Sequence, residues 1–200
     1  MQRESAKSLL AATAAGLAVA AAAPAAASAH AIIAIDRGTI VYSARDATSQ
    51  NTLTATVSGD KVRLYDPTVD GGIAPGPCEP GAVDASGYII EVFCPRDAAT
   101  RLRIDVADRE DAVHLRESGA AEPVPGVVLG GPGSDRLTGG GAADVLDSGP
   151  GEDALDGGGG ADELRARDGA ADSVACGEGA DRAIVDELDT VDATCEAVDR

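Results

Sequence analysis

The chain has 200 residues, of which 34 are acidic and 16 are Lys or Arg, so its formal net charge at pH 7 is −18. This charge argues against direct binding to nucleic acid or to anionic membranes, and it favours divalent cations as ligands. Aromatic residues make up 2% of the chain and Trp is absent, so a large conventional core is not expected. Repeat architectures avoid this requirement, because each short rung packs on its neighbours.

The first 29 residues have the pattern of a secretory signal peptide. Arg3 and Lys7 supply the positively charged start, and residues 9–23 form an Ala-rich apolar run. Small residues at 27–29 provide a cleavage site, which predicts a mature chain that begins near His30. The alternative, a membrane-anchoring helix, needs about 20 predominantly apolar residues. We therefore expect a secreted mature chain without a membrane span.

Residues 30–126 are expected to form an irregular region of short β-strands. Apolar or alternating segments indicate strands at 31–35, 39–42, 53–57, 62–65 and 101–106. The most hydrophobic strand is expected at 88–93, and the preceding segment 66–87, rich in Pro and Gly, is expected to be a long loop. Two arrangements fit this region: an irregular parallel solenoid that continues into the rest of the chain, or a separate small antiparallel β domain.

Residues 130–165 contain a strict nine-residue repeat, which reads GGPGSDRLT, GGGAADVLD, SGPGEDALD and GGGGADELR. Each unit combines a Gly-rich turn, one aspartate and, two residues later, one leucine on a very short strand. The aspartates are Asp135, Asp144, Asp153 and Asp162, and the leucines are Leu137, Leu146, Leu155 and Leu164. A disordered Gly/Asp linker is the alternative, but a linker has no reason to keep the Asp-x-Leu spacing.

This pattern resembles the RTX (haemolysin-type) calcium-binding nonapeptide, G-G-x-G-x-D-x-U-x with U apolar. The resemblance covers the four units and implies an all-β fold: a C-terminal right-handed parallel β-roll, or β-solenoid, preceded by the irregular β region. Two nonapeptides would make one coil, so Asp135 would stack with Asp153, and Asp144 with Asp162.

The resemblance also implies that Ca²⁺ lies between stacked turns, held by aspartate carboxylates and loop carbonyls. Besides the four aspartates, the implied metal-binding positions are Gly131, Gly133, Gly140, Gly149, Gly151, Gly158 and Gly160. Ala142 replaces a fourth-position Gly and Ser148 a first-position Gly, so those two turns are expected to bind less well.

Energetics also point to a bound metal. Burying one leucine contributes about 1.5–3 kcal/mol, so four leucines cannot offset the cost of ordering roughly 36 residues at about 1–2 kcal/mol each. The roll is therefore expected to fold only with its metal. Oxygen ligands on a flexible Gly-rich backbone favour Ca²⁺ over Zn²⁺ or Mg²⁺.

Weaker copies of the pattern flank the four units. Upstream, Asp111 and Val113 stand at the Asp and apolar positions of a degenerate turn. Downstream, Asp172 lies ten residues after Asp162, and Asp181 follows nine residues later, so one residue is inserted. Asp172 and Asp181 are weaker metal candidates. The expected division is thus a β-roll at 127–165, followed by degenerate repeats and a cap at 166–200.

Four cysteines in a secreted chain suggest two disulfides, for which three pairings exist. Local pairing is favoured, Cys78 with Cys94 and Cys176 with Cys195. The first bond would attach the Pro-rich loop to the strongest strand, and the second would lock the cap over the roll. A zinc site is the alternative, but the sequence has no C-x-x-C pair.

The sequence shows no catalytic motif: it has no G-x-S-x-G elbow, no H-E-x-x-H and no P-loop. Its two histidines are His30 and His114, and the latter lies in an expected strand as a surface residue. We therefore predict a secreted, non-enzymatic protein whose β-roll folds on Ca²⁺ binding. Its role would be structural or in binding an extracellular or cell-surface polysaccharide or protein. The alternative is a secreted β-solenoid hydrolase or polysaccharide lyase that uses acidic residues and calcium.

Overall fold

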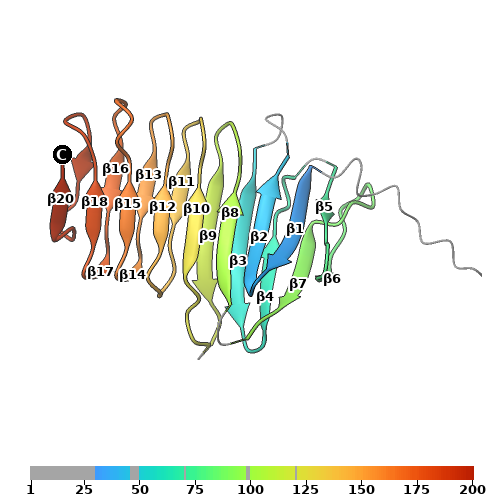
Figure 1. The fold of residues 1–200 in the computed structure, drawn as a ribbon. Helices are drawn as coiled ribbons and strands as arrows, with labels where there is room; N and C mark the ends of the chain where they lie inside the picture. The colour runs from blue at the N-terminus through green and yellow to red at the C-terminus, as the bar shows by residue number, and fades with distance from the viewer. Residues whose placement is uncertain (1–29, 46–49, 70, 98–99, 120) are drawn as a thin grey trace, which may run out of the picture.

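The computed structural model describes residues 30–45, 50–69, 71–97, 100–119 and 121–200, so the signal peptide expected at 1–29 lies outside the described part. Within these ranges the chain consists of β-strands and turns, without a helix (Figure 1). None of the described residues forms a helix of the length and apolarity that a membrane span requires. The expected all-β fold class is confirmed.

The described strands form two long sheets and one small one. In spatial order, the first sheet contains β5 (Ile73–Ala74), β1 (Ala31–Asp36), β2 (Thr39–Ala44), β8 (Arg101–Asp105), β10 (Gly126–Leu129), β12 (Val145–Asp147), β15 (Glu163–Arg165), β18 (Arg182–Ile184) and β20 (Ala197–Asp199). The second contains β6 (Glu79–Pro80), β7 (Glu91–Pro95), β4 (Lys61–Tyr65), β3 (Thr52–Ser58), β9 (Ala112–Glu117), β11 (Arg136–Thr138), β13 (Ala154–Asp156), β16 (Ser173–Ala175) and β19 (Thr190–Val191). In the small sheet, β14 (Gly159–Gly160) pairs with β17 (Glu178–Gly179).

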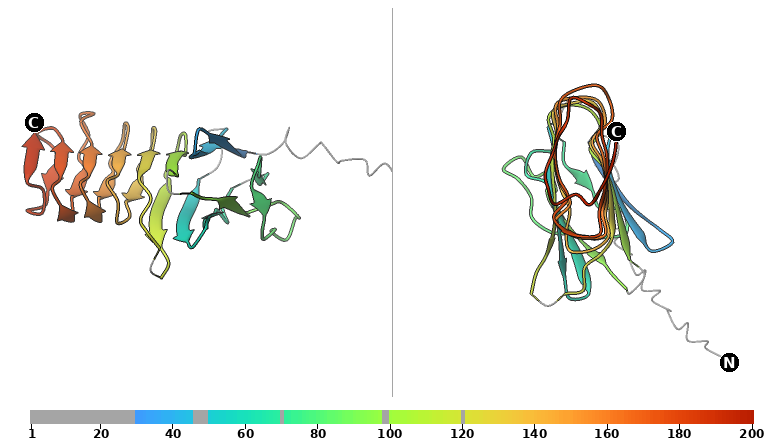
Figure 2. Two further views of the ribbon diagram at one scale, coloured as in Figure 1. Left: turned by 60° about the horizontal axis from the view of Figure 1, so that its bottom comes forward. Right: turned by 90° about the vertical axis from the view of Figure 1, so that its left-hand side faces the viewer.

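From β8 to β20 the long-sheet strands alternate between the two long sheets, so each coil contributes one strand to each. From β2 to β20 in the first sheet, and from β3 to β19 in the second, neighbouring strands are parallel. Viewed along the axis, the coils superimpose as a flattened oval (Figure 2). The parallel solenoid therefore begins well before the nine-residue repeats, at β2 and β3.

The N-terminal end of the solenoid is built differently. There β1 pairs antiparallel with β2, and β4 and β7 extend the second sheet through antiparallel pairs. Residues 30–126 thus combine the two arrangements that the sequence left open. The segment 66–87 is not entirely loop, because it contains β5, which pairs with β1, and β6, which pairs with β7. The strand expected at 88–93 begins only at Glu91.

The strand register matches the nine-residue period. Leu137 pairs with Leu155, eighteen residues later, and Leu146 pairs with Leu164 at the same spacing. Beyond the repeats Leu155 pairs with Val174, nineteen residues later, which confirms the inserted residue. Alternate residues of a strand point to opposite faces, and in each coil the repeat leucine points inward, where it is at most 2% exposed.

Both disulfides expected from the sequence are formed, between Cys78 and Cys94 and between Cys176 and Cys195. The first joins the segment after β5 to β7, at the N-terminal end. The second joins the residue after β16 to the turn before β20, at the opposite end of the solenoid. Each therefore constrains the part of the molecule where the regular repeat is missing.

Candidate calcium-binding turns

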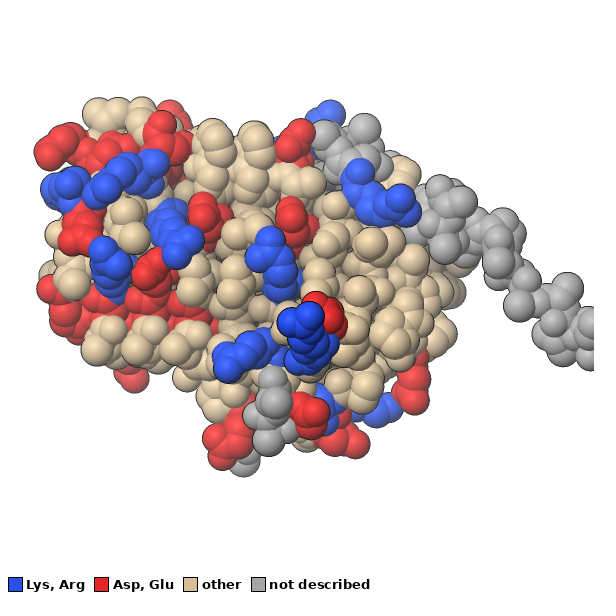
Figure 3. Space-filling model, viewed as in Figure 1, with Lys and Arg blue, Asp and Glu red and all other residues tan. Residues whose placement is uncertain are grey.

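The turns between strands stack in two columns, one along each edge of the solenoid (Figure 1). The first column leads into the strands of the second sheet, and its turns end in Asp111, Asp135, Asp153, Asp172 and Asp189. The second column leads into the strands of the first sheet, and its turns end in Asp144, Asp162, Asp181 and Glu196. The four repeat aspartates and the two weaker candidates thus lie in two stacks, as the resemblance implied. Acidic side chains gather over the C-terminal half of the molecule (Figure 3).

The acidic residues that end the turns of the two columns are called the column carboxylates. In each of the pairs described next, one carboxylate oxygen accepts a hydrogen bond from the backbone of the coil before it. In the first column, the backbone N–H of Asp135 donates to Asp153 Oδ1 at 2.7 Å, and that of Asp153 donates to Asp172 Oδ1 at 2.8 Å. In the second column, Asp144 N–H donates to Asp162 Oδ1 at 2.8 Å, and Asp162 N–H donates to Asp181 Oδ1 at 2.8 Å. Each of these aspartates thus has an acidic side chain in the coil that follows it as the acceptor for its backbone N–H.

The other carboxylate oxygen is buried and has no hydrogen-bond donor among the described residues. This holds for Oδ2 of Asp111, Asp135, Asp153, Asp162, Asp172 and Asp181. Leaving a charged oxygen buried and unpaired is costly, and such atoms are rare in native proteins. Stacked, unpaired carboxylate oxygens are the ligands that a hard cation requires, so these residues fit Ca²⁺.

Burial raises the pKa of six aspartates of the two columns in the metal-free protein. It raises the pKa of Asp135 and Asp162 to about 7, and that of Asp111, Asp144 and Asp172 to about 6, and it also raises the pKa of Asp153. Hydrogen bonds from backbone N–H groups oppose this effect, while the neighbouring column carboxylates add to it for Asp135, Asp162 and Asp172. The charged form of the columns is therefore unfavourable without a counter-ion.

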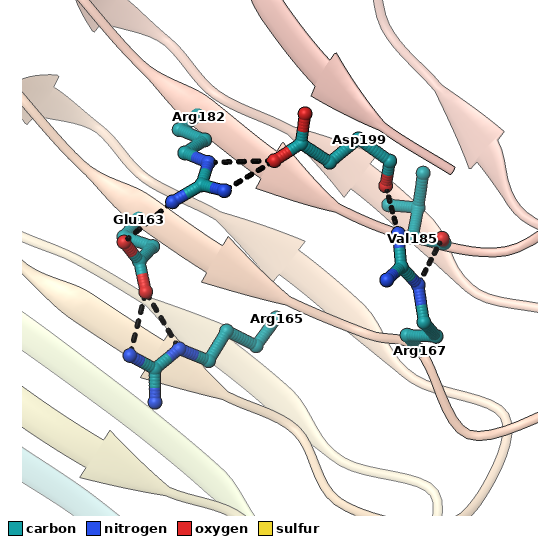
Figure 4. Close-up of polar contacts among 6 residues, drawn as sticks. All are labelled: Glu163, Arg165, Arg167, Arg182, Val185 and Asp199. Carbon is teal, nitrogen blue, oxygen red and sulfur yellow. Dashed lines mark hydrogen bonds and ion pairs between the residues drawn. The ribbon is translucent and has the colours of Figure 1, made fainter.

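The basic side chains nearby do not supply that counter-ion. On the first sheet, Arg165 pairs with Glu163 at 2.6 Å, and Arg182 contacts both Glu163, at 3.7 Å, and Asp199 (Figure 4). Arg167 donates to the carbonyl oxygens of Val185 and Asp199 instead. Among the described residues, no ion pair involves a column carboxylate.

Main-chain carbonyls also point between stacked turns. A Cβ added to Gly149 would lie 2.4 Å from the oxygen of Gly131, and one added to Gly151 would lie 1.5 Å from the oxygen of Gly133. Gly149 and Gly151 also have positive φ angles of 88° and 148°, which only glycine adopts readily. In the described part no three His, Cys, Asp or Glu side chains converge on one point, so a cation here would depend on these carbonyls as well as on carboxylates.

The turn that ends in Asp144 differs from the others. Oδ2 of Asp144 accepts a hydrogen bond from Gly140 N–H in its own turn, at 2.7 Å, and Glu117 accepts one from Gly141 N–H at 3.1 Å. This is the turn in which Ala142 replaces glycine. Its carboxylate therefore has less capacity left for a cation, and weaker binding by this turn stays a prediction. Ser148, the other departure, is fully buried at the first position of its turn.

Sequence reasoning did not identify the ends of the columns as part of them. Asn51 occupies the aspartate position one coil before Asp111, and its N–H donates to Asp111 Oδ1 at 2.5 Å. Glu196 closes the second column by accepting from Asp181 N–H at 3.0 Å. The turns that end in Asn51 and Glu196 lack both the glycines and the nine-residue spacing. Only the strand register shows that these two residues occupy column positions.

Comparison with known proteins agrees with this geometry. A family model, the RTX calcium-binding nonapeptide repeat, matches residues 129–164 in 4 copies. No curated protein and no solved structure matches the chain. Residues 129–164 are therefore RTX nonapeptide repeats, which bind Ca²⁺ and here form the central coils of a β-roll.

Proposed function

We propose that this protein is a secreted calcium-binding β-solenoid whose coils become ordered when Ca²⁺ binds. The observation that carries the proposal is the set of buried, unpaired Oδ2 atoms stacked along both columns. Without a cation these atoms disfavour the folded state, and with one they become its ligands. Binding and folding are then a single coupled equilibrium.

We place the metal-binding positions in the repeat turns. The carboxylates would come from Asp135, Asp144, Asp153 and Asp162, and the main-chain oxygens from the turn glycines Gly131, Gly133, Gly140, Gly149, Gly151, Gly158 and Gly160. Asp172 and Asp181 would extend the same columns, since both are buried and keep an unpaired Oδ2. When bound, Ca²⁺ supplies the positive charge that cancels the repulsion between stacked carboxylates.

Two features support secretion. Disulfides indicate an oxidising compartment, and RTX repeat proteins are typically extracellular. The signal-like pattern at residues 1–29 is consistent with this. Calcium outside the cell reaches the concentrations that weak extracellular calcium modules need, so folding would be completed after export.

For the biological role we propose a structural or interaction function, with an extracellular polysaccharide or protein as partner. RTX calcium-binding repeats are generally structural and not catalytic. A screen of hydrolase and polysaccharide lyase substrates with and without Ca²⁺ addresses the enzyme alternative. A calcium-dependent activity in that screen would overturn the structural role.

The direct test is a calcium titration of the chelated, purified protein. We expect calorimetry to show Ca²⁺ uptake at neutral pH, and circular dichroism to show a gain of β signal over the same concentration range. Mg²⁺ at equal concentration should produce little change, because it requires near-ideal octahedral geometry and dehydrates reluctantly. Absence of uptake, or a full β signal in chelator, would refute calcium-coupled folding.

Two aspartates of the first column should respond differently to substitution. Asp153→Ala is expected to lower calcium affinity by about tenfold or more, because it removes an unpaired oxygen from between two turns. Asp189→Ala should have a smaller effect, because both Asp189 oxygens already accept hydrogen bonds, from Asp172 N–H at 3.1 Å and Asp186 N–H at 2.6 Å. Calorimetry on both variants measures this, and equal losses would contradict the assignment of ligands.

A further inference from the structure

The turn at residues 106–111 precedes the repeats in the first column. Its sequence, Val-Ala-Asp-Arg-Glu-Asp, has no glycine and lies outside the segment 129–164 that matches the RTX repeat. It stacks directly on the first repeat turn, since β9, which follows it, is parallel to β11. Its geometry can therefore be compared, atom by atom, with that of a repeat turn.

The backbone of this turn resembles that of the repeat turn that ends in Asp153, where Gly149 and Gly151 have φ angles of 88° and 148°. Ala107 and Arg109 have φ angles of 69° and 99°, at the two positions that glycine occupies in the repeats. Positive φ is uncommon for residues other than glycine. Arg109 N–H donates to Pro132 O at 2.7 Å, just as Gly133 N–H donates to Pro150 O at 2.9 Å one coil later.

The carbonyls of the turn are placed in the same way. A Cβ added to Gly131 would lie 1.8 Å from the oxygen of Ala107, and one added to Gly133 would lie 1.6 Å from the oxygen of Arg109. The carbonyl oxygens of Gly131 and Gly133 approach Gly149 and Gly151, one coil later, in the same way. The carbonyl arrangement between repeat turns thus exists one coil earlier, without the repeat sequence.

The carboxylate of Asp111 completes the similarity. Asp111 is 3% exposed, its N–H donates to Asp135 Oδ1 at 2.8 Å, and its own Oδ1 accepts from Asn51. Its Oδ2 is buried with no hydrogen-bond donor among the described residues, and the same is true of Asp135 Oδ2. An unpaired, buried carboxylate oxygen at this depth indicates a missing cationic ligand.

We propose that the turns at 106–111 and 130–135 bind Ca²⁺ through Asp111, Asp135 and the carbonyls between them. The proposal rests on the proposed function, and it extends metal binding into a coil that the repeat sequence does not reach. The column ends there, because the amide of Asn51 donates to Asp111 Oδ1 and to Val106 O and brings no negative charge of its own. Calcium would then order the N-terminal coils as well as the repeats.

Tyr42 provides a local probe of this site. Its hydroxyl donates to Asp66 at 2.8 Å and lies 3.4 Å from Asn51 Oδ1, and Asn51 in turn contacts Asp111. Tb³⁺, a hard cation that takes calcium sites, emits when a nearby tyrosine transfers energy to it. Because this transfer falls steeply with distance, Tb³⁺ at the proposed site should be excited mainly by Tyr42.

The experiment combines calcium calorimetry with tyrosine-excited Tb³⁺ emission on the purified protein. We expect Asp111→Asn to lose one Ca²⁺ per chain and most of the Tb³⁺ emission. Asp108→Asn, an exposed carboxylate in the same turn, is the matched control and should change neither. Asp162→Asn, in the second column, should weaken calcium binding but keep the emission.

The outcomes separate this inference from the proposed function. If the unmodified protein takes up no Ca²⁺, both fail. If Asp153→Asn weakens uptake while Asp111→Asn leaves stoichiometry and emission unchanged, only the additional site is refuted. Should Asp111→Asn not fold, Tyr42→Phe still decides, because it leaves every carboxylate in place. Tyr42→Phe should abolish the Tb³⁺ emission without changing the number of bound Ca²⁺ ions. The control Tyr65→Phe should change neither quantity. Persistent emission in Tyr42→Phe would overturn the site.

Discussion

In chelator, the protein is expected to be more stable at about pH 4.5 than at about pH 7.5, and millimolar Ca²⁺ is expected to reverse this order. The reason lies in the buried carboxyl groups. In the metal-free fold the pKa of Asp135 and Asp162 is raised to about 7, and that of Asp111, Asp144 and Asp172 to about 6. In the unfolded chain these groups return to an ordinary pKa of about 3.9.

The sign of the effect follows from proton binding. Between about pH 4 and about pH 7 the folded state holds more protons than the unfolded state, so its stability falls as pH rises. The contribution is fully present below the unfolded pKa and is lost as pH passes the folded pKa. Calcium reverses the trend because it binds only the deprotonated carboxylates, so its stabilisation grows over the same pH range.

The β signal in circular dichroism, followed across this pH range with chelator or with Ca²⁺, measures both slopes. The net charge of −18 adds general repulsion at neutral pH, so a matched pair of variants is needed. Asp135→Asn should flatten the slope in chelator, whereas Glu152→Gln, which removes an exposed charge from the neighbouring turn, should leave it nearly unchanged. If the metal-free protein became more stable between about pH 4.5 and about pH 7.5, the raised pKa of the buried column carboxyl groups would be contradicted.

The second large effect is expected from Gly160→Ala. Gly160 has a φ of 132°, and an added Cβ would lie 2.1 Å from the carbonyl oxygen of Ala142 in the preceding turn of the same column. The substitution combines backbone strain with overpacking, and should lower the free energy of unfolding by about 3–5 kcal/mol in saturating Ca²⁺. It should also weaken calcium binding, because the stacked turns must move apart.

Gly159→Ala is the matched control, one residue away in the same turn. Its added Cβ would be 3.8 Å from the nearest atom, Glu178 O, and Gly159 has no positive φ. Its expected cost is below about 1 kcal/mol. Urea unfolding of both variants in Ca²⁺ provides the comparison, and a similar loss for the two would show that the turns are not packed as closely as described.

Much of the repeat region could be predicted from the sequence because its geometry is local. The regular spacing of Asp135, Asp144 and Asp153, together with the resemblance to RTX repeats, in which two nonapeptides make one coil, predicted which aspartates stack. The inserted residue before Asp172 was visible for the same reason. A difference in the turn with Ala142 could also be expected, because a residue with a Cβ disfavours the backbone angles that several of the other turns adopt.

What lies outside the repeats depended on contacts between distant parts of the chain. Residues 30–126 carry strand patterns, but a pattern of alternating side chains does not say whether the next strand is parallel or antiparallel. Pairing of β2 with β8, and of β3 with β9, joins residues about sixty positions apart in the chain. No local signal encodes such a register.

The sequence by itself determined the nine-residue period, predicted calcium through its resemblance to RTX repeats, and favoured the local pairing of the four cysteines among three possible pairings. Each of these depends on spacing along the chain or on residue type. The sequence also suggested a degenerate turn at Asp111, but only the tertiary structure showed that this turn stacks on the repeats and that Asn51 precedes it in the same column. The turn that ends in Asp111 has no glycine. It takes the shape of a repeat turn because the coil stacked on it holds its backbone through hydrogen bonds to Pro132 and Asp135. A backbone shape held by a neighbouring coil does not require glycines, so this turn shows only the Asp and apolar positions of the repeat pattern.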